Sequence, residues 1–268
     1  LERSDCEILI RLALSEDAPM GDPTTEAIFP LQARARARIV AREAGVLCGG
    51  PLVGHLLDIF REEHPARPPL EVRDLMADGE SFYPGDMLMS FEGPLQSLLR
   101  LERLALNFLQ YLSGISTTVA GAVTRAGPDI AVLDTRKTLP GYRRLAKYAV
   151  YCGGGVNHRI TLSDMAMIKD NHIAAAGGLE AAVGKVRQAF PELPLNVEVD
   201  TFEQLAKLIQ LEPDVILLDN MGAPDIARAA EEIRAHGGKI PLIEVSGGWR
   251  PEQLSELQGL GPLGVSRG

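Results

Sequence analysis

Residues 195–219 read LNVEVDTFEQLAKLIQLEPDVILLD, a short β-type run at each end joined by a segment with apolar residues at three-to-four spacing. Short apolar runs are typical of strands buried on both faces, and the middle segment is typical of an amphipathic helix. A strand, a helix and a second strand in this order favour parallel pairing. The stretch therefore predicts a βα unit of a larger α/β fold.

The same alternation extends along the chain from about residue 130. Further β-type runs are AVLDT (131–135), MAMIK (165–169) and IPLIEVS (240–246), with helical segments between them. Repeated βα units predict either an open doubly wound sheet or an α/β barrel, and we expect the barrel.

The first hundred residues have a different pattern. Strand-like pieces such as GDMLMSFEG (85–93) are separated by Gly and Pro, and a long helical stretch over 97–127 follows, which we expect to break near Gly114. We therefore predict a small N-terminal α/β domain over residues 1–101 and a barrel domain over residues 102–268.

Composition and cysteine use narrow the class of protein. The chain has 268 residues, 46% of them hydrophobic, which is enough to bury a sizeable core. Apolar runs stay well short of the ~20 residues that a membrane span needs, and the start lacks a signal-peptide pattern. Cys6, Cys48 and Cys152 are odd in number and have no metal-ligand spacing, so free thiols and a cytoplasmic location are expected.

Positive charge is concentrated in one stretch of an acidic chain. Between Thr135 and Lys169 there are seven Lys or Arg residues and one acid, Asp164, whereas the whole chain has a formal net charge of −9. A nucleic-acid-binding protein is expected to have a broad basic face instead. The stretch therefore predicts a site for a small polyanion.

Polar residues follow the predicted strands where each strand ends. They are Arg136 with Lys137, Lys169, Glu198, Asp219, and Ser246 with Gly247 and Gly248. The carboxyl ends of parallel strands meet at one edge, and in a barrel that edge holds the active site. We predict a functional face there.

Several of these residues allow a second interpretation. Arg143, Arg144 and Lys147 are expected to form a solvated helix face, and the glycines at 153–155 are either a phosphate-binding nest or, more commonly, a helix stop. His158 is either a ligand or a satisfied buried histidine. Lys169 could serve as a Schiff-base nucleophile, which would make the protein a barrel lyase or aldolase.

Five motifs together resemble one family. TRKT-x-PG-x-R (135–143), GG-x-NHR (154–159), IKDNH (168–172), LDNM (218–221) and SGG (246–248) occur in the order found in quinolinate phosphoribosyltransferases, the carboxylating nicotinate-nucleotide pyrophosphorylases. Residues 13–25 and 101–117 resemble further signatures of that family. The resemblance implies a small N-terminal α/β sandwich domain on an incomplete, seven-stranded α/β barrel, in a homodimer.

The resemblance also implies an activity in de novo NAD biosynthesis. The phosphoribosyl group of phosphoribosyl pyrophosphate (PRPP) is transferred to quinolinate with decarboxylation, giving nicotinate mononucleotide, pyrophosphate and CO₂. Both substrates are polyanions, which accounts for a mixed Arg and Lys site, because Arg binds carboxylates bidentately and Lys acts as a point charge for phosphate.

The implied site residues fall into three groups. Quinolinate is surrounded by Arg103, Arg136, His158, Arg159 and Lys169, with Lys137 near its carboxylates or the pyrophosphate, and Arg103 comes from the partner subunit. Glu198 and Asp219 serve the ribose hydroxyls and Mg²⁺, and with Lys137 and Lys169 they are the expected catalytic residues. Ser246, Gly247, Gly248 and Gly268 bind the 5′-phosphate.

The sequence departs from the family pattern near its end. Leu263 replaces an expected Asp, and the chain stops at Gly268 before an expected Thr-His-Ser segment, so we expect a truncated C-terminus. Ile160-Thr161 also replaces the usual apolar-Gly pair. These departures keep open a non-enzymatic alternative, an anion-binding homologue without catalysis.

Overall fold

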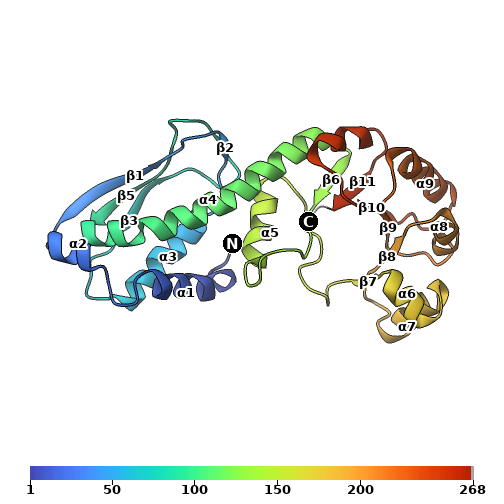
Figure 1. The fold of residues 1–268 in the computed structure, drawn as a ribbon, viewed down its shortest axis with the longest axis horizontal. Coiled ribbons are helices and arrows are strands. Elements are labelled where there is room, and N and C mark those ends of the chain that lie inside the picture. The colour runs from blue at the N-terminus through green and yellow to red at the C-terminus, as the bar shows by residue number, and fades with distance from the viewer. Residues whose placement is uncertain (267–268) are drawn as a thin grey trace. The chain divides into compact units, whose positions relative to one another are not determined.

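A computed structural model describes residues 1–266 and divides into two compact units (Figure 1). The first unit comprises Leu1–Ala120 with Thr138–Gly154, and the second comprises Gly121–Lys137 with the chain from Gly155 onward. The predicted boundary between residues 101 and 102 falls inside helix α4 (Leu95–Ala126).

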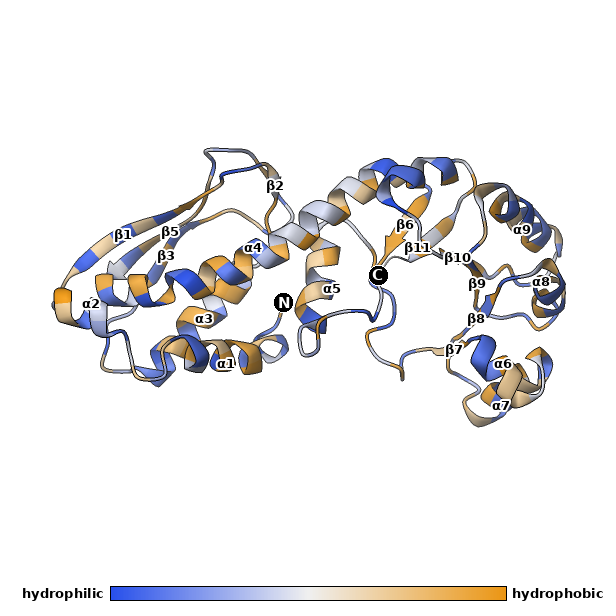
Figure 2. Ribbon diagram, viewed as in Figure 1, coloured by the Kyte–Doolittle hydropathy of each residue, from blue (hydrophilic) through white to orange (hydrophobic). Residues whose placement is uncertain are grey.

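A three-stranded antiparallel sheet forms one layer of the first unit. Its order is β1 (Arg34–Val40), β5 (Met87–Pro94) and β3 (Glu71–Leu75). The RARARIV sequence of β1 alternates exposed arginines with partly buried alanines and isoleucine, as the period of two requires (Figure 2). A second, two-stranded ladder pairs β2 (Gly45–Val46) with β4 (Ser81–Phe82).

Helices supply most of the core of the first unit. They are η1 (Arg3–Asp5), α1 (Glu7–Asp17), α2 (Pro23–Ile28), α3 (Gly50–Glu63), α5 (Arg143–Cys152) and the first part of α4. Leu101, Leu104, Phe108 and Leu112 of α4 are buried at three-to-four spacing, which places them on one face.

Helix α4 runs without interruption through Gly114, so the expected break there was wrong. A glycine inside a helix costs only about 1 kcal/mol relative to alanine, and the apolar face that α4 buries outweighs that cost. None of the described helices combines the length and the apolarity that crossing a membrane demands.

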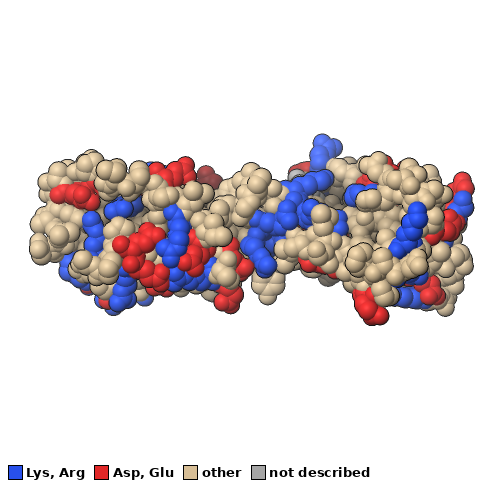
Figure 3. Space-filling view, turned by 90° about the horizontal axis from the view of Figure 1, so that it is seen from below, with Lys and Arg blue, Asp and Glu red and all other residues tan. Residues whose placement is uncertain are grey.

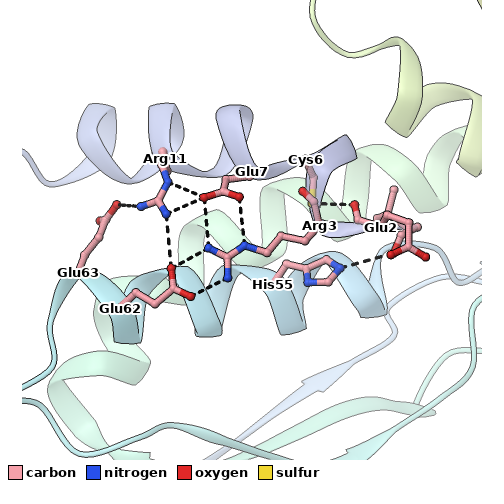
Figure 4. Close-up of polar contacts among 9 residues, drawn as sticks. Glu2, Arg3, Cys6, Glu7, Arg11, His55, Glu62 and Glu63 are labelled. Carbon is pink, nitrogen blue, oxygen red and sulfur yellow. Dashed lines mark hydrogen bonds and ion pairs between the residues drawn. The ribbon is translucent and has the colours of Figure 1, made fainter.

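An ion-pair network joins α1 to α3 on the surface of the first unit (Figure 4). Arg3 Nη1 lies 2.6 Å from Glu62 Oε1, and Arg11 contacts Glu7 Oε1 at 2.6 Å and Glu63 Oε1 at 2.7 Å. The left half of Figure 3 shows acidic and basic side chains interleaved over this unit. The two arginines of this network are therefore paired with glutamates.

The second unit is built on a parallel sheet. Its strands are, in order, β6 (Ile130–Leu133), β11 (Leu263–Ser266), β10 (Leu242–Ser246), β9 (Val215–Asp219), β8 (Leu195–Val199) and β7 (Ala166–Ile168). A single parallel bridge joins Val156 to Leu133 beyond β6, at the position of a seventh strand. The predicted α/β sandwich domain followed by an incomplete barrel is confirmed.

Helices cover the outer side of this sheet (Figure 1). They are α6 (Asp170–Ala176), α7 (Leu179–Ala189), α8 (Phe202–Ile209), α9 (Ala223–Ala235) and the short η2 (Pro251–Leu257). Residues 215–218 are all buried, as expected for a strand covered on both faces. Leu263 is also buried, at the start of β11, so its apolar side chain belongs to the core.

Candidate active site

The carboxyl ends of the strands in the second unit surround a cavity of about 760 Å³. Leu217 and Asp219 of β9 line it, and their register partners Glu244 and Ser246 of β10 line it as well. Alternate residues of a strand face the same side, so these four side chains share the face that the helices leave open.

The cavity brings together the predicted site residues of the second unit that the structure describes. They are Arg136, Lys137, His158, Arg159, Lys169, Glu198, Asp219, Ser246, Gly247 and Gly248. Arg103 is exposed on α4 in the first unit and is not among the lining residues. Gly268 lies outside the described residues.

The glycine loop after β10 packs against the residue that follows β9. Gly247 has a φ of +104°, and a Cβ atom added to it would lie 2.6 Å from the backbone nitrogen of Asn220. Asn220 itself has a φ of +56°, in the left-handed region that asparagine tolerates. Only glycine fits at position 247, and its absent side chain leaves the backbone open to a ligand.

Three of the four Lys and Arg residues that line the cavity make no ion pair within the described part of the chain: Arg136, Lys137 and Arg159. Arg159 instead donates to the carbonyl oxygen of Met165 at 3.1 Å and to Met167 Sδ at 3.2 Å. The Nε atom of Arg136 is buried and has no hydrogen-bond partner there. A buried donor without a partner is costly, so this cluster of cations favours an anionic ligand.

The two arginines also affect each other electrostatically. Burial lowers the pKa of Arg159, and the nearby positive charge of Arg136 lowers it further. An anion that binds between like charges removes this repulsion.

The acids of the cavity have partners in the protein. Glu198 Oε2 accepts from Lys169 Nζ at 2.6 Å, and Glu244 Oε2 lies 2.9 Å from His158 Nε2. Asp219 accepts one hydrogen bond from the Ser246 hydroxyl and another from Asn220 Nδ2 at 2.7 Å. Glu198, Glu244 and Asp219 therefore have hydrogen-bond partners in the protein, whereas most of the cations that line the cavity have no ion-pair partner among the described residues.

Some lining residues were not predicted from the sequence. Glu244, Trp249 and Ser266 line the cavity, and Asn196 lies beneath it, bonded to Glu244. The sequence does mark two of them, because Asn196 and Glu244 are polar residues within predicted strands. Their strand positions did not reveal which face they occupy.

The structure tests two predictions about the basic stretch, one for Lys147 and one for the glycines at 153–155. Lys147 is only 3% exposed, so the expectation that it belongs to a solvated helix face was wrong. Gly153 is the C-cap of α5, and a Cβ there would lie 2.5 Å from the carbonyl oxygen of Ser116. The glycine run thus ends a helix packed closely on α4.

Comparison with known families supplies the decisive observation. Residues 115–266 match the model of the C-terminal domain of quinolinate phosphoribosyl transferase, and residues 22–113 match that of its N-terminal domain. The chain belongs to the quinolinate phosphoribosyl transferase family. The predicted family is therefore confirmed.

Individual members of the quinolinate phosphoribosyl transferase family are similar over nearly their whole length. The nicotinate-nucleotide pyrophosphorylase [carboxylating] of Mycobacterium leprae is 41% identical, over 96% of this chain and 92% of its own. The crystal structure of NadC from Streptococcus pyogenes has a TM-score of 0.93 at 36% identity, covering 100% of this chain and 92% of that one. The nicotinate-nucleotide pyrophosphorylase from Francisella tularensis has a TM-score of 0.90 at 31% identity, with coverages of 100% and 92%.

Proposed function

We propose that this protein transfers the phosphoribosyl group of PRPP to quinolinate and releases pyrophosphate and CO₂, giving nicotinate mononucleotide. The observation that carries the proposal is the pair of arginines, Arg136 and Arg159, that share a cavity without an ion-pair partner among the described residues. Quinolinate has carboxylates on adjacent ring carbons, and a guanidinium matches a carboxylate with two parallel hydrogen bonds.

The chemistry needs no protein nucleophile. The lone pair of the pyridine nitrogen forms a bond to the anomeric carbon as the bond to pyrophosphate breaks, and positive charge develops on the ribose. The carboxylates of Glu198 and Asp219 lie in the same cavity and would stabilise that charge. The nitrogen is then cationic, so loss of CO₂ from the neighbouring carbon leaves an electron pair that the ring stabilises until a proton is taken up.

Phosphate binding is assigned to the loop after β10. Gly247 and Gly248 both have positive φ values, which expose their backbone amides, whereas the hydroxyl of the preceding Ser246 already donates to Asp219. Backbone amides arranged in this way form concave anion-binding surfaces. We assign the 5′-phosphate of PRPP to this loop and the pyrophosphate to Lys137, whose ammonium has no partner among the described residues.

The covalent alternative at Lys169 is less well supported. Its Nζ atom lies 2.6 Å from Glu198 Oε2, and this ion pair requires the protonated ammonium, which has no lone pair for attack on a carbonyl. The lysine is arranged to supply positive charge to the cavity.

The carboxylates present fit a magnesium ion. Glu198 and Asp219 offer hard oxygen ligands at the ends of the neighbouring strands β8 and β9, and Mg²⁺ needs few protein carboxylates because it retains waters and binds phosphate oxygens. When bound, Mg²⁺ would neutralise charge on the leaving pyrophosphate. Glu198 would serve it through the oxygen that does not accept from Lys169.

We further propose a homodimer in the cytoplasm, with Arg103 acting in the partner's site. Arg103 is exposed and makes no hydrogen bond or ion pair with a described residue, contrary to a simple pairing with Glu102. The first unit also has a groove of about 670 Å³ between β1 and α4, lined in part by Leu98, Leu99 and Leu106. An apolar groove beside an unpaired arginine favours contact with a second subunit.

The test is an assay of pyrophosphate release from PRPP with quinolinate or nicotinate, each with and without Mg²⁺. Quinolinate is expected to be used in the presence of Mg²⁺. Nicotinate has a single carboxylate and would leave one of the half-buried arginines without an anionic partner, so it is expected to be used poorly. Robust turnover of nicotinate, or none of quinolinate, would overturn the proposed substrate.

A further inference from the structure

Glu244 is an acid in the middle of strand β10, flanked by apolar residues. It is 3% exposed on β10, between the buried residues Ile243 and Val245. An ionised carboxylate in such a place is costly unless several donors bond to it. Its Oε2 atom accepts from His158 at 2.9 Å and from Asn196 Nδ2 at 2.8 Å.

These donors keep the carboxylate ionised. Burial raises the pKa of Glu244. The hydrogen bond from His158, the charge of that ring when it is protonated, and the hydrogen bonds from Ser266 and Asn196 together lower the pKa below its ordinary value. Asn196 is fully buried and its Oδ1 atom has no partner within residues 1–266. Among the residues that the structure describes, the one hydrogen bond of its side chain is the donation to Glu244.

The hydrogen bonds of His158 determine which ring nitrogen carries the proton. The backbone N–H of Arg159 lies 2.7 Å from His158 Nδ1, and a backbone amide can only donate, so Nδ1 must accept. The proton is therefore on Nε2 and points at Glu244.

This arrangement leaves His158 no ring nitrogen for a ligand. Its ring joins the buried carboxylate of Glu244 to the backbone of Arg159, and its own backbone N–H donates to Asp134 Oδ1 at 2.9 Å. The histidine thus connects the interior of the sheet to the loop that carries a cation of the cavity.

We infer that Glu244 and Asn196 are positioning residues, which hold His158 as the neutral Nε2–H tautomer and thereby fix Arg159 for the anionic substrate. The identity of that substrate rests on the proposed function. His158 acts in this arrangement through Arg159, in contrast to the direct contact with quinolinate that the family resemblance implied.

The test uses two substitutions of different severity. Glu244→Gln keeps an oxygen that can accept from both His158 and Asn196, as Oε2 does now. Glu244→Leu keeps the approximate volume and removes both acceptors. Glu231→Leu, at an exposed position on α9, is the control for loss of an acid elsewhere in the second unit.

The first measurement is the tautomer of His158, read from the ring nitrogens in ¹⁵N-histidine NMR spectra and assigned with His158→Asn. The Nε2–H tautomer is expected in wild type and in Glu244→Gln, and a mixture of forms is expected in Glu244→Leu. A single Nε2–H tautomer in Glu244→Leu, or a freely titrating His158 in wild type, would overturn the inference. This result does not depend on which substrate the enzyme uses.

The second measurement separates positioning from a general effect on folding. Glu244→Leu is expected to lower kcat/KM for quinolinate about 10–100-fold, chiefly through KM, as loss of an outer-shell partner does elsewhere. KM for PRPP should be unchanged, and Glu244→Gln should recover most of the loss. Equal losses for both substrates, without recovery in Glu244→Gln, would refute the positioning role. If wild type does not use quinolinate, the proposed function fails and the tautomer alone decides the role of Glu244.

Discussion

The Nζ atom of Lys169 lies 2.6 Å from Glu198 Oε2, across the ends of two neighbouring strands. Each side chain therefore limits how the other can meet a ligand. An anion that approaches Lys169 has to share the ammonium with Glu198, and a cation that approaches Glu198 has to use its second oxygen. By contrast, Lys137 has no such partner among the described residues.

Replacing Lys169 or Lys137 with alanine should lower kcat about 10²–10³-fold, or roughly 3–4 kcal/mol, as for loss of a preorganised electrostatic group. Unfolding temperatures should change little, because both residues lie at the cavity and outside the core. Lys239→Ala, which removes a surface ion pair with Asp214, is the control. A borohydride-reducible adduct at Lys169 in wild type would contradict the electrostatic role.

Gly247→Ala should impair PRPP use far more than Gly248→Ala. Both glycines have positive φ values, so alanine is strained at either position, but only at Gly247 would the new Cβ meet the backbone of Asn220. A displaced phosphate loop is expected to lower kcat/KM for PRPP about 100-fold. Steady-state kinetics with varied PRPP check this, and similar losses in the two variants would show that the close contact with Asn220 is unimportant.

Mixing Arg103→Ala with Lys169→Ala subunits should restore activity if Arg103 acts across a dimer interface. Random exchange makes half of the dimers mixed, and each has one intact site, so about a quarter of wild-type activity should return. The matched control mixes Lys137→Ala with Lys169→Ala, since both residues line one cavity and no intact site can form. Exchange without recovery in the first mixture would place Arg103 outside the partner's site.

Glu244 should make a pH-dependent contribution to stability. Its folded-state pKa lies below the ordinary 4.5, so ionised Glu244 stabilises the fold above pH 4.5, and that contribution is lost as the pH falls through the lowered value. Urea unfolding at pH 7 and pH 4 should therefore show a larger difference between wild type and Glu244→Gln at pH 7. Glu231→Gln, exposed on α9, should show little dependence on pH.

The sequence was a good guide to the barrel strands. The runs DVILLD and LNVEVD coincide with β9 and β8 to within a residue. The first is nearly continuous in apolar residues, as a strand buried on both faces is, and the second is rich in β-branched valine. Strand β11 was missed, since its residues lie in a short run of Gly, Pro and Ser that is typical of a turn. Its two neighbours, β6 and β10, provide the hydrogen bonds that make it a strand.

The sequence predicted those site residues that are charged and follow a strand. It did not predict residues whose role depends on a hydrogen bond to a residue far away in the chain. Arg136 and Lys169 follow strands and stand out in a sequence. The role of Glu244 depends on His158, which is 86 residues away, and no local pattern contains that separation. Lys147 lies on a helix with other cations, and only tertiary structure reveals that it is buried.

The intrinsic fluorescence of Trp249 can report on ligand binding in the cavity. It is the chain's single tryptophan, it lines the cavity directly after the glycine loop, and its ring is partly buried against the core of the second unit. Indole emission responds to polarity and to nearby charge, so any change on adding PRPP, pyrophosphate or quinolinate originates at this one position. The protein therefore contains its own optical probe, and titrations of ligand affinity need neither a label nor turnover.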